Sequence, residues 1–144
     1  MAKSTKPIPE GMRTLTPQIV AKNVLEVIEF VKKAFGAEQP FPPMKGPDGA
    51  ILHGHLRFGD SVIMFSEPGF SKATATNTFV YVTDVDATFA KAVSAGAKVL
   101  APVADMFWGD RWGMVEDPSG NVWQIATHVE DVPPEEMMKR MPKR

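Results

Sequence analysis

The sequence repeats one set of structural signals at an offset of about 60 residues. Each copy has a polar residue that favours a helix N-cap, then apolar residues at helical spacing, then a glycine that favours the helix end. Each copy also has a short apolar strand that follows a tight turn, and the two strands are separated by the same offset. The matched positions are Asn23 and Asp84, Gly36 and Gly96, and the segments 62–64 and 122–124. Several features matching at one offset predict two copies of one supersecondary unit.

Each copy is predicted to begin with a strand, continue with a helix and end in strands joined by tight turns. Strand patterns cover residues 15–21, 51–58 and 62–66 in the first copy, and 78–82, 98–103, 111–116 and 121–127 in the second. The sequence therefore predicts an α+β fold of two tandem βαβββ modules that enclose a shared cavity. The expected parts of this single globular domain are a flexible tail at 1–12, a first module at 13–68, a linker at 69–76, a second module at 77–130, and a C-terminal tail with a short helix at 131–144.

Composition excludes several classes of function. The chain has no cysteine, which rules out disulfides, thiolate metal sites and thiol nucleophiles. Its formal net charge of -1 gives no basic surface for nucleic acid. Residues 1–12 lack the apolar core of a signal peptide, and no apolar run approaches the length of a membrane span. We therefore expect a cytoplasmic protein whose partner is a small molecule, with no nucleic acid or membrane partner.

Strand alternation predicts which side chains line the cavity. On residues 51–58, Leu52, Leu56 and Phe58 fall on the helix side, and Ile51 falls on the other side. The same rule places Trp123 in the core. The residues expected to line the cavity on these and the neighbouring strands are His53, His55, Arg57, Met64, Phe79, Tyr81 and Gln124.

His53 and His55 lie on one face of a strand, a spacing that can bind zinc. A third ligand would have to be His128, Glu67 or a carboxylate from elsewhere. Without one, two histidines on one face are more typical of cavity lining or surface. A role for one of them as a general base is a further hypothesis.

Trp108 and Trp112 flank Asp110 and Arg111, so two indoles and a guanidinium come from one short segment. Aromatic surfaces of this kind bind flat or apolar ligands, and Arg111 could hold a carboxylate or phosphonate. In the competing interpretation, Asp110 pairs with Arg111 in a turn and the tryptophans fill the module interface. Both interpretations stay open at this point.

Several segments resemble the PhnB-like branch of the vicinal oxygen chelate superfamily, which includes glyoxalases, bleomycin resistance proteins and extradiol dioxygenases. The resemblance covers nearly the whole chain, and Ser119 and Asn121 depart from the branch where a phenylalanine and a histidine are usual. The segments include IPEG at 8–11, KAFGAE at 33–38, DVDA at 84–87, WGDR at 108–111 and DPSG at 117–120.

The resemblance also implies where a metal would bind. Metal-dependent members hold a divalent ion with histidine and glutamate side chains from strands of both modules. The corresponding positions here are Thr16, Met64, Phe79 and Gln124. Because thioether and phenyl groups cannot serve a hard divalent ion, the resemblance predicts no cofactor and no metal at the usual site.

Three functions are consistent with these observations. The first is a glyoxalase/bleomycin-resistance-like protein that binds a small planar or anionic molecule without the usual metal. The alternative is a metal-dependent lyase, isomerase or dioxygenase that uses His53 and His55, and the third is a scaffold without a ligand. A homodimer is expected from the resemblance, with the tail methionines Met137, Met138 and Met141 packing on a second chain.

Overall fold

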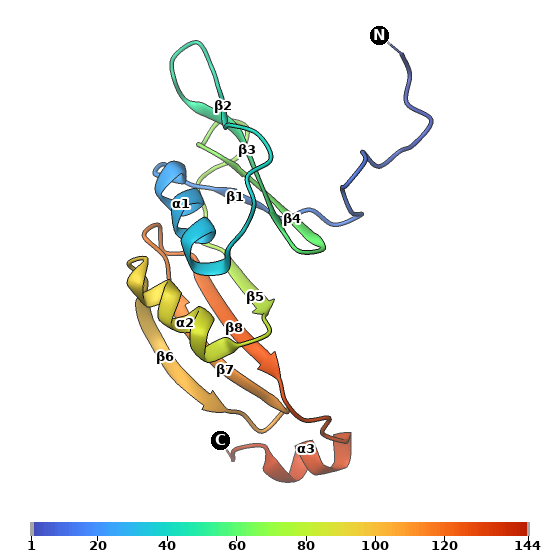
Figure 1. Cartoon of the computed structure of the whole chain (residues 1–144), viewed down its shortest axis with the longest axis vertical. Coiled ribbons are helices and arrows are strands. Elements are labelled where there is room, and N and C mark those ends of the chain that lie inside the picture. The colour runs from blue at the N-terminus through green and yellow to red at the C-terminus, as the bar shows by residue number, and fades with distance from the viewer. Residues whose placement is uncertain (1, 144) are drawn as a thin grey trace.

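A computed structural model describes residues 2–143 and contains eight strands and three helices in that range (Figure 1). The first module consists of β1 Gln18–Val20, α1 Val24–Phe35, β2 Met44–Lys45, β3 Ile51–Phe58 and β4 Ser61–Ser66. The second consists of β5 Asn77–Tyr81, α2 Val85–Ser94, β6 Lys98–Asp105, β7 Asp110–Glu116 and β8 Val122–His128, followed by α3 Pro134–Arg140.

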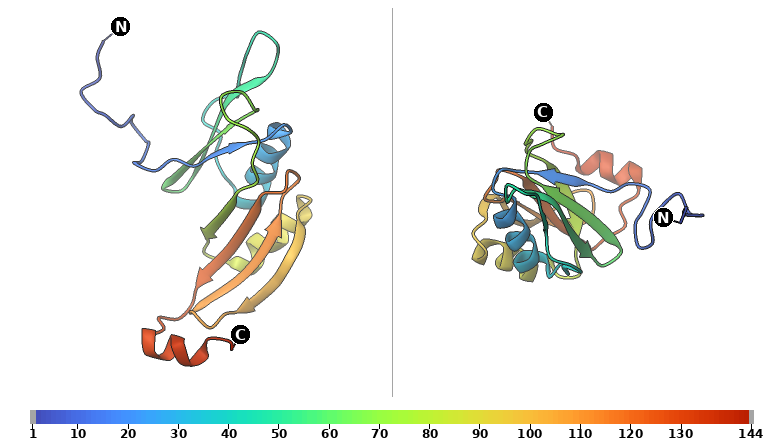
Figure 2. Two further views of the ribbon diagram at one scale, coloured as in Figure 1. Left: turned by 180° about the vertical axis from the view of Figure 1, so that it is seen from behind. Right: turned by 90° about the horizontal axis from the view of Figure 1, so that it is seen from above.

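The two modules have the same topology, which confirms the predicted pair of βαβββ units. Their four-stranded sheets have the orders β1-β4-β3-β2 and β5-β8-β7-β6. In each sheet the first strand pairs in parallel with the last, and the other pairs are antiparallel. α1 and α2 pack against each other, and each covers one face of its own sheet (Figure 2). The opposite face of each sheet stays open.

The ends of the two helices differ in how they are stabilised. Asp84 accepts a hydrogen bond from the backbone N–H of Ala87 at 3.1 Å, as expected of an N-cap. Asn23 precedes α1, but its side chain caps no backbone N–H and instead donates to the carbonyl of Pro118 at 3.4 Å. Gly36 has a φ of 67°, the left-handed conformation predicted for the residue after α1.

Trp123 lies at the centre of the hydrophobic core and joins the modules. It is fully buried, and its ring centroid lies 5.2 Å from that of Phe35 and 6.4 Å from that of Phe58. Both phenylalanines belong to the first module, whereas Trp123 belongs to β8. Aromatic packing therefore fixes how the two modules sit against each other.

The hairpin before β8 is stabilised by the buried carboxylate of Asp117. This carboxylate accepts hydrogen bonds from the backbone N–H of Ser119, from the backbone and side-chain N–H groups of Asn121, and from Nε1 of Trp123. Asn121 Oδ1 in turn accepts from the backbone N–H and hydroxyl of Thr76. One carboxylate thus connects the turn, the core tryptophan and the end of the inter-module linker.

Two details of the first module differ from the sequence-based prediction. The strand patterns predicted from the sequence leave out residues 40–49, but these residues contain the short strand β2 Met44–Lys45. The β2–β3 register is irregular, with Met44 opposite His53 and Lys45 opposite Ile51. Such a bulge interrupts alternation, so Ile51 is buried in the core while Leu52 is exposed, the reverse of the expected placement.

Replacing Asp117 with asparagine should destabilise the protein. The amide would direct N–H groups at donors that now share a carboxylate, and buried charge-assisted hydrogen bonds would be lost. We expect a decrease of ~2–4 kcal/mol in the free energy of unfolding, measured by urea denaturation. Asp48→Asn is the matched control, because Asp48 accepts one backbone hydrogen bond in an exposed loop. Equal effects of the two substitutions would contradict this role of Asp117.

Candidate functional site

An open groove of about 700 Å³ lies where the first module meets the edge of the second sheet. One wall is β5, which presents Phe79 and Tyr81. The other consists of the β3–β4 turn and the segment before β1, with Leu15 and Arg13. Phe79 and Tyr81 were predicted to line a cavity, whereas the other predicted ligand-binding residues do not line this groove. The groove is open to solvent and lies at the module junction, apart from the sheet faces where the enclosed cavity was expected.

Tyr81 connects the groove to a buried carboxylate on the second sheet. Asp110, with only 1% of its surface exposed, accepts hydrogen bonds from the Tyr81 hydroxyl at 2.9 Å and from Trp108 Nε1 at 2.7 Å. His128 Nδ1 lies 2.8 Å from the other carboxylate oxygen, and His128 Nε2 lies 2.7 Å from Asp131 Oδ1. Asp110 therefore orients an aromatic residue from each of three segments.

These contacts shift the pKa values of the groups involved. Burial by itself would raise the pKa of Asp110, but hydrogen bonds from His128, Tyr81 and Trp108 outweigh it and lower that pKa. The hydrogen bond to Asp110 raises the pKa of Tyr81. Hydrogen bonds to Asp131 and Asp110 raise the pKa of His128. The cluster therefore favours an ionised Asp110 beside a neutral Tyr81.

A second row of hydrogen bonds crosses the same face of the sheet. Trp112 Nε1 donates to Gln124 Oε1 at 3.1 Å, and Gln124 Nε2 donates to Asn77 Oδ1 at 2.9 Å. Trp112 also contacts Trp108 edge to face, with 5.8 Å between ring centroids. Both the oxygen and the nitrogen of the Gln124 amide are therefore hydrogen-bonded. Gln124 occupies the position where the resemblance places a metal-binding carboxylate.

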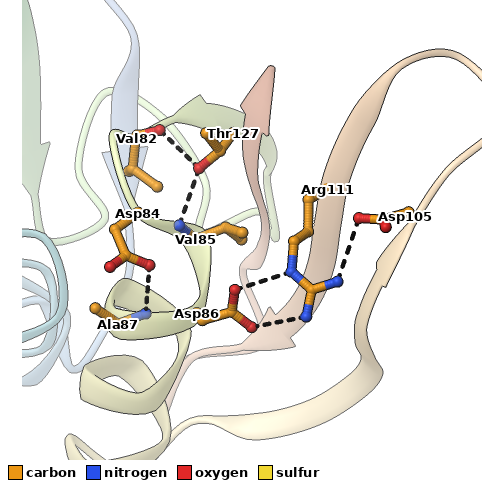
Figure 3. A network of polar contacts seen from close by, with 8 residues as sticks. All are labelled: Val82, Asp84, Val85, Asp86, Ala87, Asp105, Arg111 and Thr127. Atoms are coloured by element: carbon orange, nitrogen blue, oxygen red, sulfur yellow. Dashed lines mark hydrogen bonds and ion pairs between the residues drawn. The ribbon is translucent and has the colours of Figure 1, made fainter. Parts of the chain in front are cut away.

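Arg111 points to the opposite face of the second sheet, toward α2 (Figure 3). Its Nε and Nη2 donate to both carboxylate oxygens of Asp86 at 2.8 and 3.0 Å, and its Nη1 donates to Asp105 at 3.2 Å. The hydrogen bonds from Arg111 lower the pKa of Asp86, and those to Asp86 and Asp105 raise the pKa of Arg111. Arg111 does not pair with Asp110, and its guanidinium lies away from Trp112. It therefore holds α2 on the sheet and is not part of the candidate site.

Four residues of the first module that were predicted to bind a ligand lie on the open face of the first sheet, apart from the groove. They are His53, His55, Arg57 and Met64. The rings of His53 and His55 are 6.0 Å apart between centroids, and Met64 lies directly opposite His55 on β4. Burial, then the positive charges of His53 and Arg57, lower the pKa of His55. Arg57 donates from Nη2 to Glu38 at 2.6 Å.

No group of three histidine, aspartate or glutamate side chains within residues 2–143 is arranged to hold a metal ion. The two residues considered as a third ligand beside the histidine pair are engaged elsewhere. Glu67 accepts a hydrogen bond from the backbone N–H of Ile51, and His128 lies in the second module between two aspartates. The side chains at the superfamily's metal positions include a thioether and a phenyl ring. The metal site implied by the alternative function therefore has its two histidines but no third histidine or carboxylate ligand among residues 2–143.

Two features of the site were missed by reasoning from the sequence. Arg13, placed next to the expected tail, lies in the groove and donates from Nε to the backbone carbonyl of Asp60 at 3.2 Å. The sequence predicts for Asp110 only a pairing with Arg111 in a turn, although Asp110 is the common acceptor for Tyr81, Trp108 and His128. The tight spacing of Trp108 and Asp110 was the one local signal for that contact.

Most of the sequence matches one known protein family. The model of the Glyoxalase/Bleomycin resistance protein/Dioxygenase superfamily matches residues 14–125. The chain belongs to this superfamily. An uncharacterized protein of Mycobacterium bovis is 33% identical over 139 residues, which cover 88% of this chain and 91% of that protein.

Solved structures show the same superfamily fold. TioX from Micromonospora sp. ML1 has a TM-score of 0.68 at 22% identity and covers 81% of this chain and 99% of its own. Lactoylglutathione lyase from Agrobacterium tumefaciens has a TM-score of 0.61 at 17% identity, with 85% and 96% covered. The superfamily assignment made from sequence motifs is confirmed. None of the helices in residues 2–143 is long and apolar enough to cross a membrane.

The contribution of His128 to stability should depend on pH. Both ring nitrogens face carboxylates, and only the protonated ring can donate to both. Because the folded-state pKa is raised above 6.5, the stabilisation is complete below that value and is lost as pH rises through the raised pKa. The difference in unfolding free energy between the natural protein and His128→Gln should therefore shrink as the pH rises above 6.5 and through the raised pKa of His128.

Titration of the His128 ring protons by NMR provides the direct check. The pKa of His128 should exceed 6.5 in the natural protein and fall in Asp131→Asn, because Asp131, the acceptor that raises this pKa most, then loses its charge. A His128 pKa at or below 6.5 in the natural protein would show that the two contacts do not hold the protonated ring.

Proposed function

We propose that this superfamily member binds a small, flat, anionic organic molecule in the groove between Arg13 and β5, without a metal ion. The observation that carries the proposal is the groove of about 700 Å³ with Phe79 and Tyr81 on one wall. Its volume falls in the range of ligand sites in proteins, and its position at a module junction is typical of them. The PhnB-like assignment and a cytoplasmic location belong to the same proposal.

Aromatic side chains that are held in place favour binding of a flat molecule. The rings of Phe79 and Tyr81 lie 5.1 Å apart between centroids, and the Tyr81 hydroxyl is fixed by Asp110. Even so, 40% of Phe79 and 63% of Tyr81 is exposed. A ligand that stacks on these rings would bury apolar surface at little cost in side-chain order.

Polar groups around the groove supply hydrogen bonds and a positive charge. β5 is the edge strand of its sheet, so one side of its backbone has no strand partner and faces outward. The Arg13 Nε contacts the carbonyl of Asp60, which leaves its terminal nitrogens available for a carboxylate or phosphonate group. An aromatic acid combines the two features that the groove recognises.

The alternative, a metal-dependent enzyme that uses His53 and His55, has no specific support from the contacts. The histidine pair lacks a third hard ligand within residues 2–143, and the groove does not include the pair. We therefore do not propose lyase, isomerase or dioxygenase chemistry for the chain.

We further propose that a second copy of the chain packs on the region around Leu15, at the rim of the groove, and on the C-terminal segment. Large apolar side chains in this region are exposed, including Leu15 at 86%. Met138 and Met141 on the C-terminal segment are also exposed, as expected for residues that contact a partner. Patches of exposed apolar side chains mark interaction surfaces. Sedimentation equilibrium should report a homodimer, and a monomer at micromolar concentrations would overturn this part of the proposal.

Phe79→Ala should weaken binding of a flat aromatic acid such as 2-naphthoate. Loss of the stacking surface in a largely apolar groove should raise the dissociation constant about 10-fold or more. Calorimetry would measure the constant. Phe70→Ala is the matched control, because Phe70 is fully exposed on the linker and lies outside the groove.

Comparison of 2-naphthoate with its neutral amide tests the charged end of the groove. Arg13→Gln should reduce the preference for the acid over the amide and leave amide binding nearly unchanged. The proposal is overturned if 2-naphthoate and related aromatic acids do not bind at millimolar concentration, or if Phe70→Ala weakens binding as much as Phe79→Ala.

A further inference from the structure

Four potential metal ligands meet on the open face of the first sheet. β3 carries His53 and His55, which are separated by one residue and therefore share a face. Met44 of β2 is the cross-strand partner of His53, and Met64 of β4 is the partner of His55. Because β3 and β4 pair regularly, His55 and Met64 point to the same face with their Cβ atoms ~5 Å apart, whereas Met44 pairs with His53 at the β2–β3 bulge. We name this set the imidazole–thioether cluster: Met44, His53, His55 and Met64.

The packing of α1 determines which way this cluster points. Gly54 lies between the two histidines, and a Cβ atom added there would come within 2.9 Å of Ile28 on α1. Residue 54 therefore faces the helix directly, and His53 and His55 project from the other side of the sheet. All four side chains are partly or largely exposed, so an ion can reach them from solvent.

The distance between the two rings is suited to one shared ion. Their centroids lie 6.0 Å apart with the ring planes inclined by 61°. An ion bound at ~2 Å from one nitrogen of each ring would separate those nitrogens by up to ~4 Å, which fits rings at this spacing. Phe41 lies against both imidazoles, at 5.1 Å from His55 and 6.1 Å from His53 between centroids. Its ring shields one side of the space between them.

The type of donor determines which ion can bind. Carboxylates and carbonyl oxygens select hard ions such as Mg²⁺ and Ca²⁺, and none of the four side chains supplies one. Thioether sulfur is a soft ligand that selects Cu(I), and imidazole also suits copper. The same methionine that rules out a hard ion at the superfamily's usual position is thus a good ligand for a soft one.

We propose that the imidazole–thioether cluster binds one Cu(I) ion per chain. The two imidazoles bind the ion between them, and the thioethers of Met44 and Met64 complete its coordination from the neighbouring strands. The cluster does not line the groove assigned to an organic ligand, so the two sites are separate and either can exist without the other.

Anaerobic titration with Cu(I) against a chromophoric Cu(I) chelator tests the proposal on the full-length, untagged protein. We expect one Cu(I) per chain and copper–sulfur scattering in the X-ray absorption spectrum. His53→Ala combined with His55→Ala should abolish competition with the chelator. Met64→Leu and Met44→Leu keep the side-chain volume and should each raise the dissociation constant roughly 10-fold or more through loss of a ligand.

Met114→Leu provides the matched control, because Met114 lies on the open face of the second sheet, where it pairs with Gln124. This variant should bind Cu(I) as the natural protein does. Circular dichroism would verify that each variant is folded.

Three outcomes of the Cu(I) experiments would overturn the proposal. They are no stoichiometric Cu(I) binding by the natural protein, equal affinities of Met64→Leu and Met114→Leu, and copper bound without sulfur scattering. Zn²⁺ bound more tightly than Cu(I) and unaffected by the methionine substitutions would likewise exclude a soft-ion site.

Discussion

The burial of Trp123 between the modules is the constraint on which the rest of the structure depends. A fully buried indole N–H needs an acceptor, and Asp117 supplies it at 2.9 Å. The buried carboxylate needs donors of its own, which the turn provides through Ser119 and Asn121. Residues of one short hairpin meet each requirement. Any other conformation of this segment would leave buried polar groups without hydrogen-bond partners.

This constraint also positions the candidate site. Trp123 packs against Phe35 and Phe58 of the first module, and Asn121 holds Thr76 immediately before β5. The edge of β5 is thereby placed opposite the β3–β4 turn, and the space between them is the groove. The open faces of the sheets carry no part of this packing. Their side chains can therefore differ from those of metal-dependent superfamily members without loss of the fold.

The sequence predicts the fold well because its signals are local and repeated. Asp84 caps α2 and Gly36 follows α1 in the left-handed conformation, as their residue types indicate. Alternation also places Trp123 correctly in the core. The failures occur where alternation is interrupted or where partners are distant in sequence. A bulge reverses the expected placement of Ile51 and Leu52, and no local pattern shows it.

The candidate site depends more on such distant partners, so less of it follows from the sequence. Phe79 and Tyr81 were assigned to a ligand site, and the groove contains them. Arg111 was grouped with Trp112 because they are adjacent, although adjacent strand residues point to opposite faces and Arg111 contacts Asp86 on α2. The pairing of Met44 with His53 requires the register of β2, a strand that is absent from the sequence-based prediction.

The central claim is that the groove along β5 is a metal-free site for a flat, anionic molecule. NMR chemical shift mapping with aromatic acids, on protein treated with a chelator, tests this claim most directly. The account predicts that shifts concentrate on Arg13, Phe79, Tyr81 and the backbone of β5, and that added Mg²⁺ or Zn²⁺ does not change the affinity. Shifts centred on His53 and His55, or binding that requires a divalent ion, would contradict it.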